Sequence, residues 1–201
     1  MKWDEITVNK YYEILDILND EIGDAIEYNA RLIDCIWGID SADIPIVRFS
    51  WYLDELKFLQ EPYKPKTPKK EYVIKGIKFR PTLDVSKITT AQYIDYQELL
   101  KRNEHKLLLN VLFIKDGEDY GQSDYSDLLW ENLTLPDYSD VMFFFLRLLN
   151  NLTMDTLNSS KKTLKKMYRR EKDPKKKEEL MDEMVKIQQA LLAISENEYL
   201  G

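Results

Sequence analysis

One histidine, His105, and one cysteine, Cys35, are the first candidates for chemistry, since these side chains act as nucleophiles, general bases and transition-metal ligands. A single copy of each excludes an intramolecular disulfide and any metal centre built from several cysteines or histidines. His105 stands between a glutamate and a lysine, a setting typical of an exposed polar histidine. Cys35 falls on the apolar side of a predicted helix, where a free cysteine is usually buried. We therefore predict no catalytic residue, no cofactor and no metal site.

A group of carboxylates in a Gly- and Ser-rich stretch is the next candidate, as a calcium loop. Its members are Asp116, Glu118, Asp119, Asp124 and Asp127. Their spacing does not match an EF-hand loop, which needs its glycine and terminal glutamate at fixed positions. No phosphate loop is present either, because neither Gly117 nor Gly121 is followed by Lys-Ser or Lys-Thr. We interpret the stretch as a solvated loop, with adventitious cation binding as the alternative.

The segment Lys161–Lys177 is the strongest electrostatic feature of the sequence. It contains eight lysines and two arginines against one glutamate and one aspartate, so its formal charge is +8 and that of the remainder is −15. Three readings stay open: a solvated helical hairpin whose charge is offset by the acidic body or by a neighbouring copy, a contact with an acidic protein surface, or a contact with nucleic acid. Tyr168 is the lone aromatic residue there, so base stacking has little support. By charge density, Lys165, Arg169 and Arg170 are the candidate contact residues.

Composition places the chain among folded proteins, because 44% of its 201 residues are hydrophobic. The N-terminal MKWDEITVNKYYEI lacks the basic start and apolar run of a signal peptide. The most apolar run, VMFFFLRLL at 141–149, is short and contains Arg147, which favours a buried helix over a membrane span. We therefore expect no membrane partner.

Three acidic helices are predicted in residues 1–61, which carry 14 acidic and five basic residues. Thr7 is placed to cap the first helix, and Gly38 to end the second, which starts near Ile22. The apolar residues that recur at helical spacing in the third are Phe49, Tyr52, Leu53, Leu56 and Leu59.

Residues 62–70 follow as a linker: the stretch 61–70 holds three prolines and four lysines, which excludes a helix. We interpret it as an extended spacer, with a proline-rich ligand for a partner domain as the alternative.

A β-hairpin is predicted around Lys75-Gly76, since apolar and aromatic residues flank this pair and glycine accepts the positive φ of a tight turn. A short extended piece, 82–85, should follow. Thr89 and Gln92 then fit a capping box, so that a helix starts at Thr90.

The rest of the central segment, up to residue 150, is predicted to be mostly helical. Periodicity leaves 107–114 open between helix and strand; its leucine content favours helix. A loop over 116–126, a short helix over 127–133 and a long helix from Pro136 complete the segment.

The C-terminal segment, 151–201, is predicted to form an antiparallel hairpin of two helices joined at Asp173-Pro174. The second helix has a heptad-like row at spacings of four and three: Leu180, Met184, Ile187, Leu191 and Ile194. Ile187 and Leu191 are therefore candidate interaction residues, within the hairpin or with another subunit. The predicted fold class is mainly α with a small β-hairpin (α+β), with a helical N-terminal segment and a central hairpin followed by a capped helix.

Four stretches of the chain resemble a family of small proteins encoded in the morphogenesis regions of tailed bacteriophages, particularly those of gut Bacteroidetes. They read ITVNKYYEILDIL, YVIKGIKFRPTLDVSKITTAQYIDYQELL, LLNVLFIKDGEDY and DVMFFFLRLL, and cover most of residues 5–150. The resemblance implies a non-enzymatic protein of the virion or host cytoplasm whose partners are other phage structural proteins, such as portal, tail or capsid components. It leaves open a structural subunit of the particle or a tail assembly chaperone absent from it. The basic hairpin lies outside the resemblance.

Overall fold

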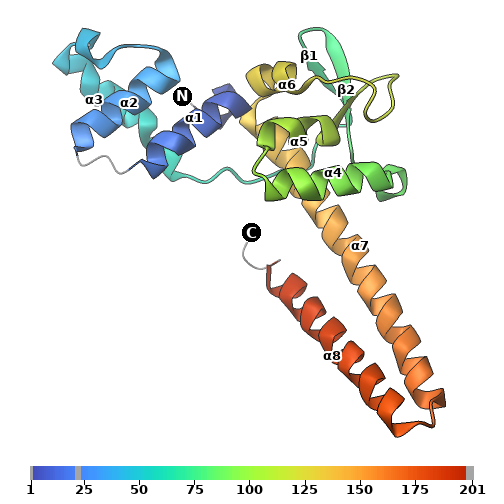
Figure 1. Cartoon of the computed structure of the whole chain (residues 1–201). Coiled ribbons are helices and arrows are strands. Elements are labelled where there is room, and N and C mark those ends of the chain that lie inside the picture. The colour runs from blue at the N-terminus through green and yellow to red at the C-terminus, as the bar shows by residue number, and fades with distance from the viewer. Residues whose placement is uncertain (1, 21–23, 198–201) are drawn as a thin grey trace. The chain divides into compact units, whose positions relative to one another are not determined.

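The computed structural model of the chain describes residues 2–20 and 24–197 (Figure 1). It contains mostly helices and one small antiparallel sheet, so the predicted fold class is confirmed. The chain divides into two compact units, Met1–Phe144, which we call the body, and Phe145–Gly201. The division falls inside helix α7 (Leu135–Arg170), six residues before the boundary expected from the sequence. That helix runs without a break through residue 150.

The body begins with a short 3₁₀ helix, Trp3–Glu5, and continues with α1 (Val8–Asn19), α2 (Ala25–Trp37), a 3₁₀ turn at Ser41–Asp43 and α3 (Ile46–Glu55), which a 3₁₀ helix, Leu56–Gln60, extends. The hydroxyl of Thr7 accepts the N–H of Lys10 at 3.3 Å, as the sequence predicted. Gly38, at φ +66°, ends α2, again as predicted. The predicted start of the second helix, Ile22, lies outside the described residues.

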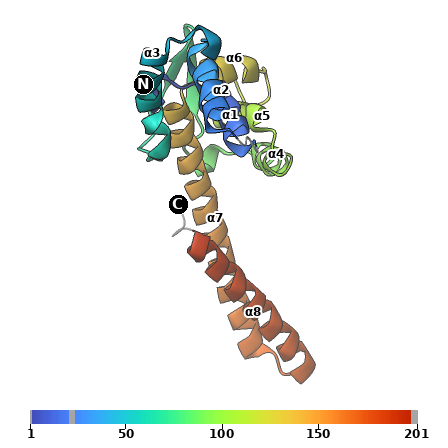
Figure 2. The ribbon, with the colours of Figure 1, turned by 90° about the vertical axis from the view of Figure 1, so that its left-hand side faces the viewer.

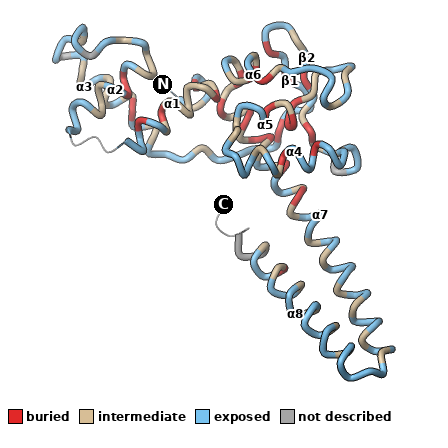
Figure 3. The backbone as a smooth tube through the Cα atoms, viewed as in Figure 1, coloured by how far each residue is buried: buried red, intermediate tan, exposed pale blue. Residues whose placement is uncertain are grey.

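Two hydrophobic groups fill the body, and Figure 3 shows their buried stretches in red. One joins α1, α2 and the end of α3 through Ile6, Ile14, Ile17, Leu32, Ile33 and Leu56. The other lies between the sheet and the helices around it, where Phe79, Leu108, Leu109 and Leu129 are fully buried. Because α1 contacts both α2 and α6, the N-terminal helices and the central segment form one unit.

The Pro/Lys linker 62–70 has no regular secondary structure, as predicted, yet it is bound along its length. Asp140, which is buried in the second turn of α7, accepts two hydrogen bonds from it. The Tyr63 hydroxyl donates at 2.9 Å and the Lys66 N–H at 2.6 Å. Lys69 adds an ion pair with Asp137 at 2.7 Å. The linker is therefore part of the body's packing.

The sheet has the order β1-β2-β3 and is antiparallel throughout, with β1 at Tyr72–Ile74, β2 at Ile77–Pro81 and β3 at Phe113–Lys115. The predicted turn is confirmed: Lys75 and Gly76 take φ values of +49° and +80°, the pattern of a type I′ turn. Phe79 in the central strand faces Tyr72 on one side and Lys115 on the other.

The apolar run 107–114, for which helix was favoured, divides between two states. Helix α5 (His105–Leu112) ends at Leu112, and Phe113 begins β3. The residue after β2 explains where the helix stops. Thr82 donates its N–H to the carbonyl of Leu112 at 2.8 Å and its hydroxyl to that of Val111 at 3.0 Å, which removes two carbonyls from any longer helix.

The prediction of an extended piece over 82–85 is wrong at its last residue, Val85. Val85–Lys87 forms a 3₁₀ turn because the Asp84 carboxylate accepts the N–H of Ser86 at 3.0 Å and its hydroxyl at 2.7 Å. Helix α4 (Thr90–Lys101) then begins as expected. Both hydrogen bonds of the capping box between Thr89 and Gln92 are present.

Helix α6 (Ser126–Asn132) starts one residue before the predicted position and leads directly into α7. Two backbone hydrogen bonds tie this junction to the start of the chain: Val8 donates to Leu133 at 2.9 Å and Leu135 donates to Ile6 at 2.7 Å. Helix α8 (Pro174–Asn197) follows α7 after a three-residue turn. In the described ranges, no helix is both long and apolar enough to cross a bilayer.

Replacement of Asp140 by alanine should release the linker. The Tyr63 hydroxyl and the Lys66 N–H lose their acceptor, which should cost about 1–3 kcal/mol of unfolding free energy. We expect a lower urea midpoint and faster tryptic cleavage after Lys66, Lys69 and Lys70. The matched control is Asp155→Ala, an exposed aspartate on the same helix, which should leave both unchanged. Equal cleavage rates in wild type and Asp140→Ala would show that Asp140 does not hold the linker.

Candidate functional site

The C-terminal hairpin of α7 and α8 is the candidate site, and its helices run side by side in both Figure 1 and Figure 2. The less exposed residues alternate at spacings of three and four on each helix. In the second half of α7 this row is Met154, Leu157, Lys161, Leu164 and Tyr168; on α8 it is Leu180, Met184, Ile187, Leu191 and Ile194, with Lys177 and Ala190 also partly buried. This is the spacing of an antiparallel helix seam, as the sequence predicted for α8. Lys161 lies in the seam and donates a hydrogen bond to Gln188 of α8.

The ten cations of 161–177 form no close ion pair with an aspartate or glutamate among the residues whose side chains the structure places. Lys176 and Lys177 act on the Glu171 carboxylate only at longer range. The two acidic residues of the segment serve the turn instead. Glu171 accepts the N–H groups of Asp173 at 3.0 Å and Lys172 at 2.8 Å, and these bonds hold the pKa of its carboxyl below the usual range. Asp173 accepts the N–H of Lys175 at 3.0 Å and so caps α8.

The aromatic residue of this segment does not face outward. Tyr168 is half-buried in the seam, and the ammonium of Lys177 lies 5.6 Å from its ring centroid. The ring is thus already used for a cation–π contact within the hairpin. This arrangement favours a partner that is bound through its negative charge over a nucleic acid whose bases stack on an aromatic ring.

The five candidate residues fall into two groups. Lys165, Arg169 and Arg170 are exposed, and the first two continue the row of Lys161 at four-residue intervals along α7. Ile187 is half-buried and Leu191 is 8% exposed, both in the seam. The structure therefore gives the two apolar residues a role in holding the hairpin together, and leaves the three cations accessible to a partner.

A second apolar row on α8 was missed at the sequence level. Met181, Val185 and Leu192 are 45%, 48% and 51% exposed, and their spacings of four and seven place them on one helix face beside the seam. The signal was present in the sequence but is weaker than the heptad row next to it. Gln188 lies in this row and accepts the hydrogen bond of Lys161, so the row shares a side of the hairpin with Lys165 and Arg169.

His105 is not the exposed residue that the sequence predicted. It is half-buried and stacks on Tyr12 of α1 with ring centroids 4.8 Å apart, and Tyr12 in turn stacks on Trp130 of α6 at 5.0 Å. Its Nδ1 atom is buried and has no hydrogen-bond partner in the described part of the chain. Burial lowers the pKa of His105, so the imidazole is neutral at pH 7. The ring serves as a flat packing surface.

Cys35 is partly buried in the N-terminal hydrophobic group, so the predicted burial is only partial. Burial raises the pKa of its thiol despite the neighbouring ammonium of Lys10, and the sulfur lies 3.7 Å from a carboxylate oxygen of Glu13. A thiol held protonated is a poor nucleophile. The Glu13 carboxylate is therefore a potential base beside Cys35, but it accepts a hydrogen bond from a thiol that burial keeps protonated.

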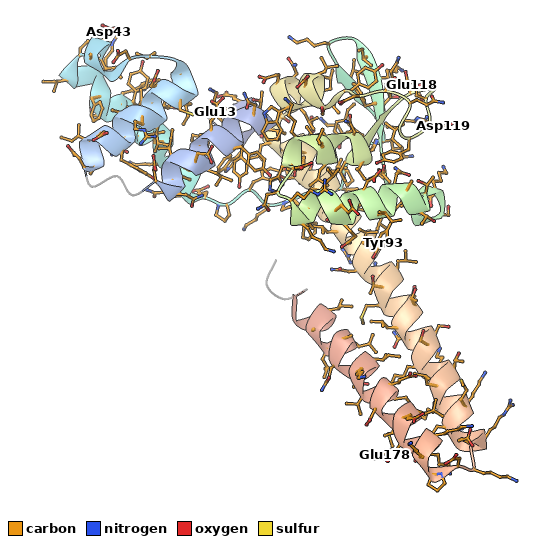
Figure 4. The ribbon with its side chains drawn as sticks, viewed as in Figure 1. Glu13, Asp43, Tyr93, Glu118, Asp119 and Glu178 are labelled. Carbon is orange, nitrogen blue, oxygen red and sulfur yellow. The ribbon has the colours of Figure 1, made fainter. Side chains whose placement is uncertain are left out.

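The acidic loop keeps its carboxylates apart, and Figure 4 labels Glu118 and Asp119 there. Asp116 pairs with Arg80 at 3.0 Å, Glu118 with Lys115 at 2.6 Å, and Asp127 with Lys106. Asp124 accepts hydrogen bonds from Asn110 at 2.7 Å and from the Ser126 N–H at 2.8 Å. Consistent with these separate partners, the described residues contain no cluster of three or more potential metal ligands.

Among the open clefts of the body, two are lined entirely by described residues. The larger, about 820 Å³, is bordered by the end of β2, by β3 and by the start of α4, and three basic and three acidic side chains line it. The smaller, about 470 Å³, lies between α4 and the acidic loop. The larger cleft has no excess charge that would select an ionic ligand, and neither cleft is lined by histidine or cysteine.

Comparison with known proteins gives no relative: no family model matches the chain, and neither a curated protein nor a solved structure is similar to it.

Protonation of His105 should make stability depend on pH. Its folded pKa lies below the unfolded value of about 6.5, so the unfolded chain binds this proton first and stability falls as pH drops from about 6.5 through the folded pKa. The variant His105→Phe keeps a stacking ring without the titration. Its urea midpoint, measured in parallel with wild type from about pH 7.5 to about pH 5.5, should fall less. If the urea midpoints of wild type and variant fell in parallel with pH, burial would not lower the pKa of this histidine.

A charge in the hairpin seam should break its packing. For Ile187→Asp or Leu191→Asp we expect the free energy of unfolding to fall by about 2 kcal/mol or more, since each change replaces a packed apolar side chain of the seam by a carboxylate. Melting followed by circular dichroism at the helical band tests this. Gln189→Asp is the matched control, an exposed position on the same helix that carries the same new side chain. Unchanged melting and unchanged oligomeric state in the seam variants would count against a packed hairpin.

Proposed function

We propose that this chain is a non-enzymatic structural or morphogenesis protein of a tailed bacteriophage, retained in the particle as a subunit, and that it binds other virion proteins through its C-terminal hairpin. The observation that carries the proposal is the hairpin surface itself. The exposed cations Lys165 and Arg169 stand beside an exposed apolar row, a combination suited to an acidic protein surface with an apolar centre. The resemblance of residues 5–150 to phage morphogenesis proteins supplies the biological setting.

Electrostatics support a protein partner over nucleic acid. The chain outside 161–177 carries a formal charge of −15, which repels phosphate backbones. A protein partner needs only a local acidic patch facing the hairpin. Portal, tail and capsid components are the partners that the resemblance suggests.

A transient role is the second candidate. Met181, Val185 and Leu192 form an exposed apolar row of the kind that holds an aggregation-prone segment until it assembles. In that case the protein would be a tail assembly chaperone, present in the host cytoplasm and absent from the mature virion.

Quantitative mass spectrometry of purified particles from the phage that encodes this sequence separates the two roles. A subunit should appear at a fixed ratio to the major capsid protein, and lysine-directed cross-links should run from Lys165 and its neighbours to another virion protein. Absence from particles, together with abundance in infected cells, would identify the chaperone role. Absence from both would refute the phage assignment altogether.

A further inference from the structure

One face of helix α4 is a wall of both clefts described above. The α4 residues that line the clefts recur at spacings of three and four, which places them on one face of the helix: Ala91 and Gln92 in the larger cleft, and Asp95, Glu98, Leu99 and Arg102 in the smaller. Helix α4 has 12 residues and is therefore about 18 Å long. The two clefts follow each other along this face, the larger at the start of the helix and the smaller toward its end.

Tyr120 separates the two clefts. Among the residues that the structure describes, it alone lines both of them. It belongs to the loop between β3 and α6, and its hydroxyl donates a hydrogen bond of 2.6 Å to the carboxylate of Asp95, midway along α4. Burial and this carboxylate raise the pKa of the Tyr120 hydroxyl, so it remains a donor at neutral pH. Gly121 follows at φ +83°, a conformation that glycine adopts without strain.

The two ends of this loop, 116–125, are fixed to elements other than α4. At its start, Asp116 and Glu118 form ion pairs with side chains of the sheet at 3.0 Å and 2.6 Å. At its end, Asp124 accepts a hydrogen bond from α5 at 2.7 Å. The bond from Tyr120 to Asp95 is what ties the middle of the loop to the face of α4. The middle can therefore lift while both ends stay in place.

We propose that the two clefts are halves of one groove along α4, and that the loop 116–125 is a strap across this groove, held closed by the hydrogen bond between Tyr120 and Asp95. When the bond breaks, the tyrosine ring leaves the face of α4 and the two clefts join. A single exposed hydrogen bond contributes little net free energy, so the open form is a minor state of the same fold. A ligand that fills the whole groove binds only the open form and holds the strap open. This device lies apart from the hairpin of the proposed function and does not depend on it.

Hydrogen exchange of the full-length chain, followed by mass spectrometry, tests the strap. Tyr120→Phe keeps the ring and removes the donor, so the backbone amides of 119–123 should exchange about two- to tenfold faster than in wild type. Asp95→Ala should give the same increase, and the double variant no further increase, since both changes remove one contact. Tyr93→Phe is the matched control, an exposed tyrosine on the same helix, and should leave the exchange of the loop unchanged.

Relaxation of methyl groups by a neutral, soluble gadolinium chelate tests whether the clefts join. Ile114 in the larger cleft and Leu99 in the smaller are both half-buried. The relaxation enhancement of their methyl groups should rise in Tyr120→Phe, and rise further in Tyr120→Ala, which removes the ring. The methyl groups of Leu108 and Leu109 are fully buried in the same unit and should not change, so they report any loss of fold.

Loop exchange that is equal or slower in Tyr120→Phe would overturn the proposal. Faster exchange with unchanged relaxation of both methyl groups would show that the loop moves without joining the clefts, and would also refute it. Exchange that becomes faster in β2 as well as in the loop would mean that the bond supports the whole body, which is a third refuting result. Since these measurements use the isolated protein, their failure leaves the proposed virion role standing.

Discussion

The position of α1 is the constraint on which the body depends. One side of this helix supplies Ile14 and Ile17 to the hydrophobic group shared with α2, and Tyr12 on another side stacks between His105 and Trp130. The backbone bonds of Ile6 and Val8 fix the junction between α6 and α7 to the start of α1. One short helix thus joins the N-terminal helices to the sheet-containing segment, and neither group could keep its buried surface without it.

Charge segregation is the second organising feature, and it operates separately in each unit. In the body, Asp116, Glu118 and Asp127 each pair with a nearby cation. In the hairpin the cations are concentrated, while Glu171 and Asp173 are committed to backbone N–H groups at the turn. The ten cations of 161–177 repel one another, which costs some stability, and acidic residues of α8 such as Glu178 and Asp182 offset part of that charge. Binding of an acidic surface would reduce that repulsion, and this reduction favours complex formation.

Features set by neighbours in the sequence could be predicted, and features set by distant contacts could not. The Thr89–Gln92 capping box and the Lys75-Gly76 turn depend on residues within a few positions, so pattern alone identified them. The strand at Phe113 exists because β2 pairs with it, and the stacking of His105 depends on an aromatic ring from α1. The linker was recognised as extended, yet its anchor Asp140 lies 77 positions beyond Tyr63, out of reach of any local rule. At the candidate site the cations could be predicted from the density of charge in the sequence. That Met181, Val185 and Leu192 form an exposed apolar row could be seen only from their exposure in the structure.

The hydrogen bond between Lys161 and Gln188 also determines how the two hairpin helices align. An apolar seam with heptad spacing tolerates sliding, because each shift by seven residues places leucine-like side chains against leucine-like side chains again. The hydrogen bond does not survive such a shift. A slip of one heptad toward the turn would set Lys161 beside Met181, whose thioether is a much weaker acceptor than the amide oxygen of Gln188. Together with the contact between Lys177 and the Tyr168 ring, this hydrogen bond favours one register among several that are nearly equal in apolar packing, and it places Lys165 and Arg169 beside the exposed row.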